Sequence, residues 1–413
     1  MTDGGMVIHI PKCLADDIVS SGLRIDLRDS LAVMTWLIAS RSRGATYCNI
    51  SHALMAQYVR RPTILQLKQQ LLDWRVIECD GRYSAHEPNA KSFGYRIGTC
   101  AAASEVIQYS VSSRPCLKRL CETPRISVSV TTDVQRWLSN CLRRTVMDER
   151  AARHIADELS PDCRLHAHAS IDWFKKGWLW FKPDGHGRVH TNVTNLKREL
   201  RPTLHFRNGE TLVELDIRCS QPTLLYGMLP KGARAATDAL EYLELCRSGD
   251  LYAALAGDML RDDAKRAFFH FLYSYPVETH GRRRRIHSDP VKERARCRRD
   301  AVGRLMAARF PTVNQFIVGT KRQRGHRGFS HEMQRLESGL VIDSVCGRLM
   351  RENPDISILT IHDSLLTNAS SASKVQTTFD STLQAMGIAA TVSATTYKRS
   401  DGTTGPTSSP TPI

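Results

Sequence analysis

The 413-residue sequence lacks the features of secreted and membrane-embedded proteins. No stretch approaches the length of a membrane span, and the first residues contain no basic segment followed by an apolar run, so we expect neither a membrane partner nor a signal peptide. The twelve cysteines show no paired CxxC spacing; Cys116 and Cys121 come closest, without a second pair. We therefore expect reduced thiols and a cytoplasmic location, nucleoid-associated in a bacterium, with neither a disulfide framework nor a zinc knuckle.

An excess of negative charge is also absent. The chain has 58 Lys and Arg against 42 Asp and Glu, a net charge of +16, and its pI is near 9.5. A basic surface attracts polyanions, most often nucleic acid, although a basic protein without such a partner has the same composition. The length allows two or three domains with cores of their own.

The first 98 residues are expected to form a separate unit. A helix is predicted at 31–41, capped by Asp29-Ser30 and stopped by Gly44. A second, which Asn49 and Ser51 can cap, runs through Val59, and a third begins at Pro62. Asp80-Gly81 then predicts a tight hairpin, with FGYRI as a last strand. Three helices and a hairpin resemble a winged helix-turn-helix, which would place the third helix in a DNA groove. A helical protein-interaction module is the alternative.

The rest of the chain divides by composition and periodicity. Residues 98–130 are Ser/Thr-rich and predict a linker, residues 131–170 predict helices, and 400–413 predict a disordered tail. We further expect a strand at 211–217, helices at 258–274 and 331–351, and a buried hairpin at 356–366.

Two aspartates follow unusually apolar strands. Asp216 is the last residue but one of TLVELDI, and His362-Asp363 lies at the centre of ISILTIHDSLL. A lone aspartate at a strand end is usually a turn residue, but two neighbouring ones would repel each other unless a cation lies between them. Mg²⁺ suits carboxylate and phosphate oxygens, and a pair of such ions activates a 3′-hydroxyl and stabilises a leaving pyrophosphate. The pattern predicts two Mg²⁺ ions, with Mn²⁺ as a substitute.

A helix at 258–274, with Asp258 as its cap, is predicted to present one stripe that is cationic at its N-terminal end and aromatic further on. Four side chains at four-residue spacing share one face: Arg261, Lys265, Phe269 and Tyr273. Cations near the helix N-terminus suit a triphosphate, and the aromatic rings suit a base and sugar. Taken alone, the stripe also fits an amphipathic helix with aromatic core residues and solvated cations.

These segments resemble family A polymerases, the relatives of bacterial DNA polymerase I. The helix matches the family's K-x3-F-x3-Y fingers pattern, VELDIRCSQPTLL resembles motif A, and TIHDSLL resembles motif C. Gly187-Arg188 and Asn195-Leu196 have the spacing of the primer-template motif T-G-R-L-x5-N-L. The four elements occur in the family's order and cover about residues 185–370.

The resemblance implies a role for each matching residue. Asp216 and Asp363 would hold the metals, and Arg261 and Lys265 would bind the triphosphate, with Lys265 protonating the pyrophosphate. Phe269 and Tyr273 would pack on the incoming nucleotide. A DNA primer-template would contact the remaining residues that match the family's motifs, namely Arg188, Asn195 and His362.

Departures from the family leave the sugar and the template open. Gln221 stands where DNA polymerases have a glutamate that excludes the 2′-hydroxyl and phage RNA polymerases have a glycine. Its bulk, together with Phe269, favours dNTPs. Ser364 and Cys219-Ser220 look more like the single-subunit phage RNA polymerases, whose motif C is His-Asp-Ser. An RNA template is also compatible with these motifs.

Outside these motifs the sequence offers less. The N-terminal third shows no exonuclease pattern, so we expect no proofreading. The basic run at 281–299 predicts either a backbone-tracking segment or a disordered charged loop. Trp173, Trp178 and Trp180 are interleaved with lysines, which fits a stacking surface, but a buried core is favoured for most of them.

The predicted fold is a right-hand polymerase of the α/β (α+β) class, with an antiparallel palm sheet, helical fingers and a helical thumb. The predicted divisions are a winged-helix-like unit at 1–98, a linker and thumb-like region at 99–185, a palm and fingers core at 186–399, and the tail. We predict a DNA polymerase for a small replicon such as a phage, plasmid or integrated element. The alternatives are an RNA polymerase or primase-like enzyme, and a DNA-binding initiator with a degenerate polymerase core.

Overall fold

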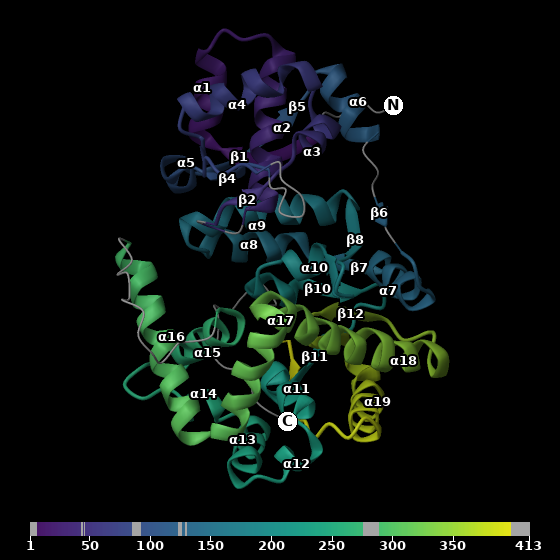
Figure 1. Ribbon diagram of the computed structural model, residues 1–413. Coiled ribbons are helices and arrows are strands. Elements are labelled where there is room, and N and C mark those ends of the chain that lie inside the picture. Colours follow the sequence, from purple (N-terminus) through teal and green to yellow (C-terminus); the bar gives the residue numbers. More distant parts are fainter. Residues whose placement is uncertain are drawn as a thin grey trace.

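The computed structural model of the chain describes residues 6–42, 44, 46–84, 92–122, 126–128, 130–275 and 289–397. Helices and sheets are mixed along these residues, and their apolar side chains form two separate cores. Figure 1 shows the N-terminal elements at one end of the molecule and helices α11–α19 towards the other. Among the described residues, no helix combines the length and apolar character needed to cross a membrane.

The N-terminal core is formed mainly by the first helices of the chain and two small sheets. The helices are α1 (Lys12–Ser20), α2 (Ile25–Arg41), α3 (His52–Tyr58) and α4 (Ile64–Asp73), the last preceded by the 3₁₀ turn η1 (Arg61–Thr63). Strands β2 (Cys48–Asn49), β3 (Ile77–Cys79) and β4 (Gly94–Ile97) form an antiparallel sheet in the order β2-β4-β3. Strand β1 (Met6–Pro11) pairs with β5 (Val106–Val111). The Ser51 hydroxyl caps α3 by accepting from the Leu54 backbone N–H, as predicted.

Helix α2 begins six residues earlier than predicted. Asp29 and Ser30 do not cap it; both are buried inside it. The Asp29 carboxylate accepts from Tyr109 Oη at 2.8 Å and from two backbone N–H groups in the segment after β5. Asp29 therefore links α2 to residues about 80 positions later in the chain, a contact that the local capping rule does not predict.

The expected linker at 98–130 is also wrong, and the hairpin expected at Asp80-Gly81 runs into residues 85–91, which lie outside the described part. The described partner of β3 is β4, and Asp80 Oδ1 accepts from the Gly94 backbone N–H at 2.8 Å. The supposed linker contains α5 (Thr99–Ala103), β5, α6 (Arg114–Glu122) and β6 (Ile126–Val128). Because β5 pairs with β1 along its whole length, this segment belongs to the N-terminal core.

The middle of the chain is helical, as residues 131–170 predict, with α7 (Asp133–Arg143), α8 (Glu149–Glu158) and α9 (Pro161–Lys175). Strands β6, β8 (Leu179–Pro183) and β9 (Val189–Thr191) form one sheet, and β7 (Thr145–Met147) pairs with β10 (Leu204–Phe206). Two short helical segments, α10 (Asn192–Asn195) and the 3₁₀ segment η2 (Arg198–Thr203), follow β9. Trp173 and Trp178 are buried in the N-terminal core, which confirms the core interpretation for both.

The C-terminal core is built on a four-stranded antiparallel sheet in the order β12-β13-β11-β14. Its strands are β11 (Leu212–Ile217), β12 (Ile358–Ile361), β13 (Ser364–Asn368) and β14 (Val392–Thr396), so the predicted strand at 211–217 and hairpin at 356–366 are confirmed. Helix α19 (Ala372–Ala385), which follows the 3₁₀ turn η4 (Ala369–Ser371), packs against β11, β13 and β14. Helices α7 and α10 pack against β12.

Between β11 and β12 the chain is helical. The segments are α11 (Ser220–Met228), α12 (Lys231–Arg234), α13 (Thr237–Ser248), α14 (Leu251–Ala254), α15 (Arg261–Tyr273), α16 (Pro290–Arg309), α17 (Pro311–Ser338), the π-helical segment η3 (Gly339–Cys346) and α18 (Gly347–Glu352). Helices α15, α16 and α17 contact one another, and α17 bends at Gly325, where φ is 73°. Leu260 is the N-cap of α15, so the predicted cap at Asp258 is wrong. The expected tail at 400–413 lies outside the described residues.

A buried carboxylate joins the N-terminal elements to the middle of the chain. Asp172 on α9 is 1 % exposed and accepts from the His9 backbone N–H, Trp36 Nε1 and Arg153 Nη2 at 2.9–3.0 Å. The oxygen that accepts from Arg153 also contacts His9 Nδ1 at 2.9 Å. Burial pushes the pKa of Asp172 upward, but the His9 hydrogen bond and the nearby charges of Lys176 and Arg153 hold it below its usual value. We call this cluster the Asp172 junction.

Candidate active site

The two predicted metal aspartates are brought together by the C-terminal sheet. Asp216, the fifth residue of β11, pairs in register with Ser364 of β13. Asp363 immediately precedes Ser364, in the two-residue turn that joins β12 to β13. Residues opposite each other on antiparallel strands lie about 5 Å apart, so the turn places Asp363 beside Asp216. The turn is tight because His362 has a left-handed backbone, with φ of 56°.

Both aspartates resist ionisation. Burial and the negative charge of Glu214 raise the pKa of Asp216 to about 6, against the opposing charge of Lys265. Burial, Asp216 and Glu337 raise the pKa of Asp363 to about 7, against the opposing charge of Arg188. These two carboxyl groups therefore share a site in which negative charge is under-compensated. Such a site favours a bound cation.

The stripe on α15 faces this pair. Arg261 and Lys265 are exposed, whereas Phe269 and Tyr273 are partly buried, with ring centroids 6.1 Å apart and nearly parallel planes. Lys265 lowers the pKa of Asp216, and Asp363 contributes to the raised pKa of Tyr273 after the larger effects of burial and Glu337. The two ends of the stripe thus lie within electrostatic range of different members of the aspartate pair.

Tyr252 on α14 lies under the cationic end of the stripe. Arg261 and Lys265 are positioned over its ring, 5.8 and 5.7 Å from the centroid. Such cation–π contacts hold both cations on the side of the helix that faces the sheet. Arg261 also forms an ion pair with the exposed Asp262, at 3.7 Å.

Glu337 belongs to the site, and the sequence analysis missed it. It lies in the last turn of α17, is 2 % exposed, and accepts from Arg188 Nε and Nη2 at 3.0 and 2.7 Å. Its second oxygen accepts from Gln221 Nε2 at 2.6 Å. Arg188 and Gln221, predicted for different roles, are therefore held by one carboxylate. An acidic residue inside an apolar helical face was the only trace of this in the sequence.

Two predicted site residues remain, His362 and Asn195. His362 lies in the turn beside Asp363, and its ring is 6.1 Å from that of His190. Asn195 lines a small depression with Arg41 and Trp180, where the N-terminal unit approaches β8 and α10. Of the predicted primer-template residues, Arg188 therefore contacts Glu337, whereas Asn195 lines this depression.

The basic run at 281–299 is only partly described. Residues 276–288 lie outside the described part, and the rest forms the first half of α16, so the loop expectation is wrong for residues 290–299. Arg298 forms an ion pair with Asp263 of α15 at 3.0 Å, and Arg299 pairs with its neighbour Asp300 at 2.6 Å. Arg298, from this basic run, therefore links α16 to α15.

The aspartate pair is a minimal ligand set for a metal ion. No group of three or more His, Cys, Asp or Glu side chains within the described residues is arranged to hold a metal. Magnesium in phosphoryl-transfer sites is commonly held by one or two carboxylates, with phosphate oxygens and water completing its shell. Two under-compensated carboxylates fit that requirement when a triphosphate is bound.

Comparisons with known proteins give little. No family model and no curated protein matches the chain. Among solved structures, it is similar to the POL domain of Pol1 from M. smegmatis in complex with DNA primer-template and dNTP. The match has a TM-score of 0.39 at 12 % identity and covers 60 % of this chain and 55 % of that domain. A likeness of this size does not establish a shared fold or activity.

Proposed function

We propose that the chain is a template-directed nucleic-acid polymerase of family A type, most simply a DNA polymerase without proofreading. The observation that carries the proposal is the convergence of Asp216, Asp363 and the stripe of α15 from three separate segments. Each feature alone fits an ordinary structural role. Together they provide under-compensated carboxylates for metal ions, cations for a triphosphate and aromatic rings for a base.

Asp216 and Asp363 would hold two Mg²⁺ ions, which supply an activated 3′-hydroxyl and a stabilised pyrophosphate when bound. Lys265 and Arg261 bind the phosphates, and Lys265 can donate a proton to the departing pyrophosphate. Phe269 and Tyr273 pack on the base and sugar. Because both aspartates must be ionised to bind a cation, turnover rises with pH across their raised pKa values.

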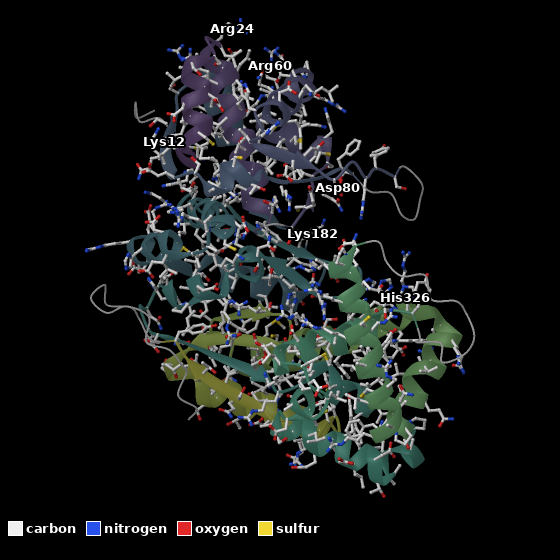
Figure 2. The ribbon with its side chains drawn as sticks, turned by 90° about the vertical axis from the view of Figure 1, so that its left-hand side faces the viewer. Lys12, Arg24, Arg60, Asp80, Lys182 and His326 are labelled. Atoms are coloured by element: carbon white, nitrogen blue, oxygen red, sulfur yellow. The ribbon has the colours of Figure 1, made fainter. Side chains whose placement is uncertain are left out.

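In this proposal the C-terminal sheet acts as the palm, and α15 with its neighbours as the fingers. The N-terminal unit acts as a DNA-binding module: α2, α3 and α4 with the β2-β4-β3 sheet have the element order of a winged helix. The outward residues of α4 include Leu65, Gln66 and Gln69, none of which is basic. Figure 2 shows Arg24 and Arg60 at the outer end of this unit, well away from His326 on α17.

Primer extension by the purified full-length chain tests the proposal. DNA and RNA templates are supplied with Mg²⁺ and either dNTPs or rNTPs, and Asp216→Ala and Asp363→Ala serve as inactive controls. We expect extension of a DNA primer with dNTPs that both substitutions abolish. Tight DNA binding without extension under any condition would instead support the initiator with a degenerate core.

One observation favours the second candidate, an RNA polymerase or primase-like enzyme. Gln221 Oε1 is buried and has no hydrogen-bond partner within the described part of the chain. A ribose 2′-hydroxyl could donate to this acceptor. The rNTP arms of the same assay decide between the candidates, and Gln221→Gly should alter the sugar preference in either case.

A further inference from the structure

We propose that Glu337 is the positioning residue that sets sugar selection, by fixing the orientation of the Gln221 amide. This inference rests on the polymerase function proposed above. Glu337 is buried, and its two oxygens are engaged within the protein: one accepts from Arg188 and the other from Gln221. Its position is therefore internal to the site, and its effect on substrate must pass through these two side chains.

The charge of Glu337 determines which end of the Gln221 amide faces it. A buried carboxylate is tolerated only when it is paired and hydrogen-bonded, and Arg188 satisfies that condition with two bonds to one oxygen. An ionised carboxylate accepts hydrogen bonds and cannot donate them. Only the NH₂ end of Gln221 can face Glu337, so Oε1 is directed away from it.

The fixed amide lies where the sugar of a nucleotide would be. Gln221 is at the start of α11, five residues after Asp216, and Tyr273 from α15 is within electrostatic range of both Glu337 and Asp363. Tyr273 Oη, like Gln221 Oε1, is buried with no hydrogen-bond partner among the residues that the structure describes. Two unsatisfied polar atoms beside the aspartate pair mark the surface that would contact the sugar hydroxyls.

Helix α17 holds this arrangement rigidly. Ser338, next to Glu337, donates from Oγ to the His186 carbonyl at 2.6 Å. Gly187 has φ of 84°, and a Cβ there would lie only 2.9 Å from Ser338 Oγ. The segment that carries Arg188 therefore packs tightly against the last turn of α17. Arg188, Glu337 and Gln221 thus form one hydrogen-bonded chain, next to this tight packing.

The test is the ratio of kcat/KM for a dNTP to that for the matching rNTP, measured with full-length wild type, Glu337→Ala and Glu337→Gln. Releasing the amide lets it swing or flip, so in Glu337→Ala the ratio moves at least about tenfold towards one, whichever sugar wild type prefers. Glu337→Gln shifts it in the same direction by less, since two amides can pair in either orientation. This variant keeps the test valid if Glu337→Ala fails to fold.

Two comparisons separate positioning from general damage. Glu332→Gln, on the same helix but in a partly exposed ion pair with Arg324, should leave the ratio unchanged. If Glu337 acts through Gln221, adding Glu337→Ala to Gln221→Ala changes the ratio no further. A folded, active Glu337 variant with the wild-type ratio overturns the inference, whereas a wild type that extends nothing overturns the proposed function instead.

Discussion

The Asp172 junction and the Asp216–Asp363 pair are both carboxylate sites within the folded chain, but they have opposite electrostatics. Asp172 accepts hydrogen bonds from three side chains and a backbone N–H, and its pKa is lowered. Asp216 and Asp363 face each other, and their pKa values are raised to about 6 and 7. The first site is complete within the protein, whereas the second has a deficit of positive charge. That deficit distinguishes a ligand site from a structural one.

The largest difference that we expect between the two sites is in polymerase activity. Asp363→Ala should reduce primer extension by at least about 10³-fold, roughly 4 kcal/mol of transition-state stabilisation, because a metal ligand is lost. Asp172→Asn should leave kcat within a few-fold at a temperature where the variant is folded. Single-turnover extension measures the activity of both variants. Equal losses in the two would contradict a catalytic role for the aspartate pair.

Stability should show the reverse pattern. Asp172→Asn leaves Arg153 without its buried counter-ion, so it should lower the free energy of unfolding by about 3–5 kcal/mol. Because the pKa of Asp172 is depressed, its contribution is present above its unfolded pKa and is lost as pH falls through the folded value. Urea denaturation at pH 7 and at pH 3 measures this, and a loss that is the same at both pH values would contradict the account.

Substitution of Lys265 is expected to reduce activity by less than substitution of Asp363. Lys265→Ala should lower kcat by about 10²-fold through the loss of a phosphate ligand and proton donor. Arg266→Ala is the matched control, because Arg266 is the next residue on α15 and pairs instead with the neighbouring Asp263 at 3.2 Å. Steady-state kinetics with saturating primer-template separates them; similar losses would show that only net charge matters.

The smallest expected effect is the change that Asp363→Asn makes to the stability of the metal-free protein. Because the pKa of Asp363 is raised in the folded state, the folded form binds more protons than the unfolded one, and stability falls as pH rises between about 4 and 7. Asp363→Asn removes this penalty and should stabilise the chain by about 1 kcal/mol or more at pH 8 in EDTA. Thermal unfolding across pH checks the sign, and destabilisation at pH 8 would place Asp363 with Asp172 as a structural carboxylate.

The sequence predicted the local parts of the site well. VELDI and TIHDSLL became strands with their aspartates at the expected ends, and the four-residue spacing on α15 produced one face. These features depend on periodicity within a few residues, which a sequence displays directly. The Ser51 cap and the helix after Pro62 were predictable for the same reason.

What the sequence could not predict depends on distant partners. Asp29 looked like a helix cap because its long-range donors lie beyond residue 108, and β5 looked like a linker because its partner is the first strand. Glu337 lies in no motif; its importance comes from Arg188 and Gln221, more than 100 residues away along the chain. Tertiary contacts of this kind override local preference.

The most direct test of the central claim is the binding of Mn²⁺, followed by electron paramagnetic resonance, in the presence of primer-template and a non-hydrolysable nucleoside triphosphate. The account predicts two protein-bound ions in wild type and in Asp172→Asn, displaced by excess Mg²⁺ and lost in Asp216→Asn and Asp363→Asn. Undiminished binding in the Asp216 and Asp363 variants, or none in folded wild type, would contradict the assignment of the aspartate pair as a metal-dependent catalytic centre.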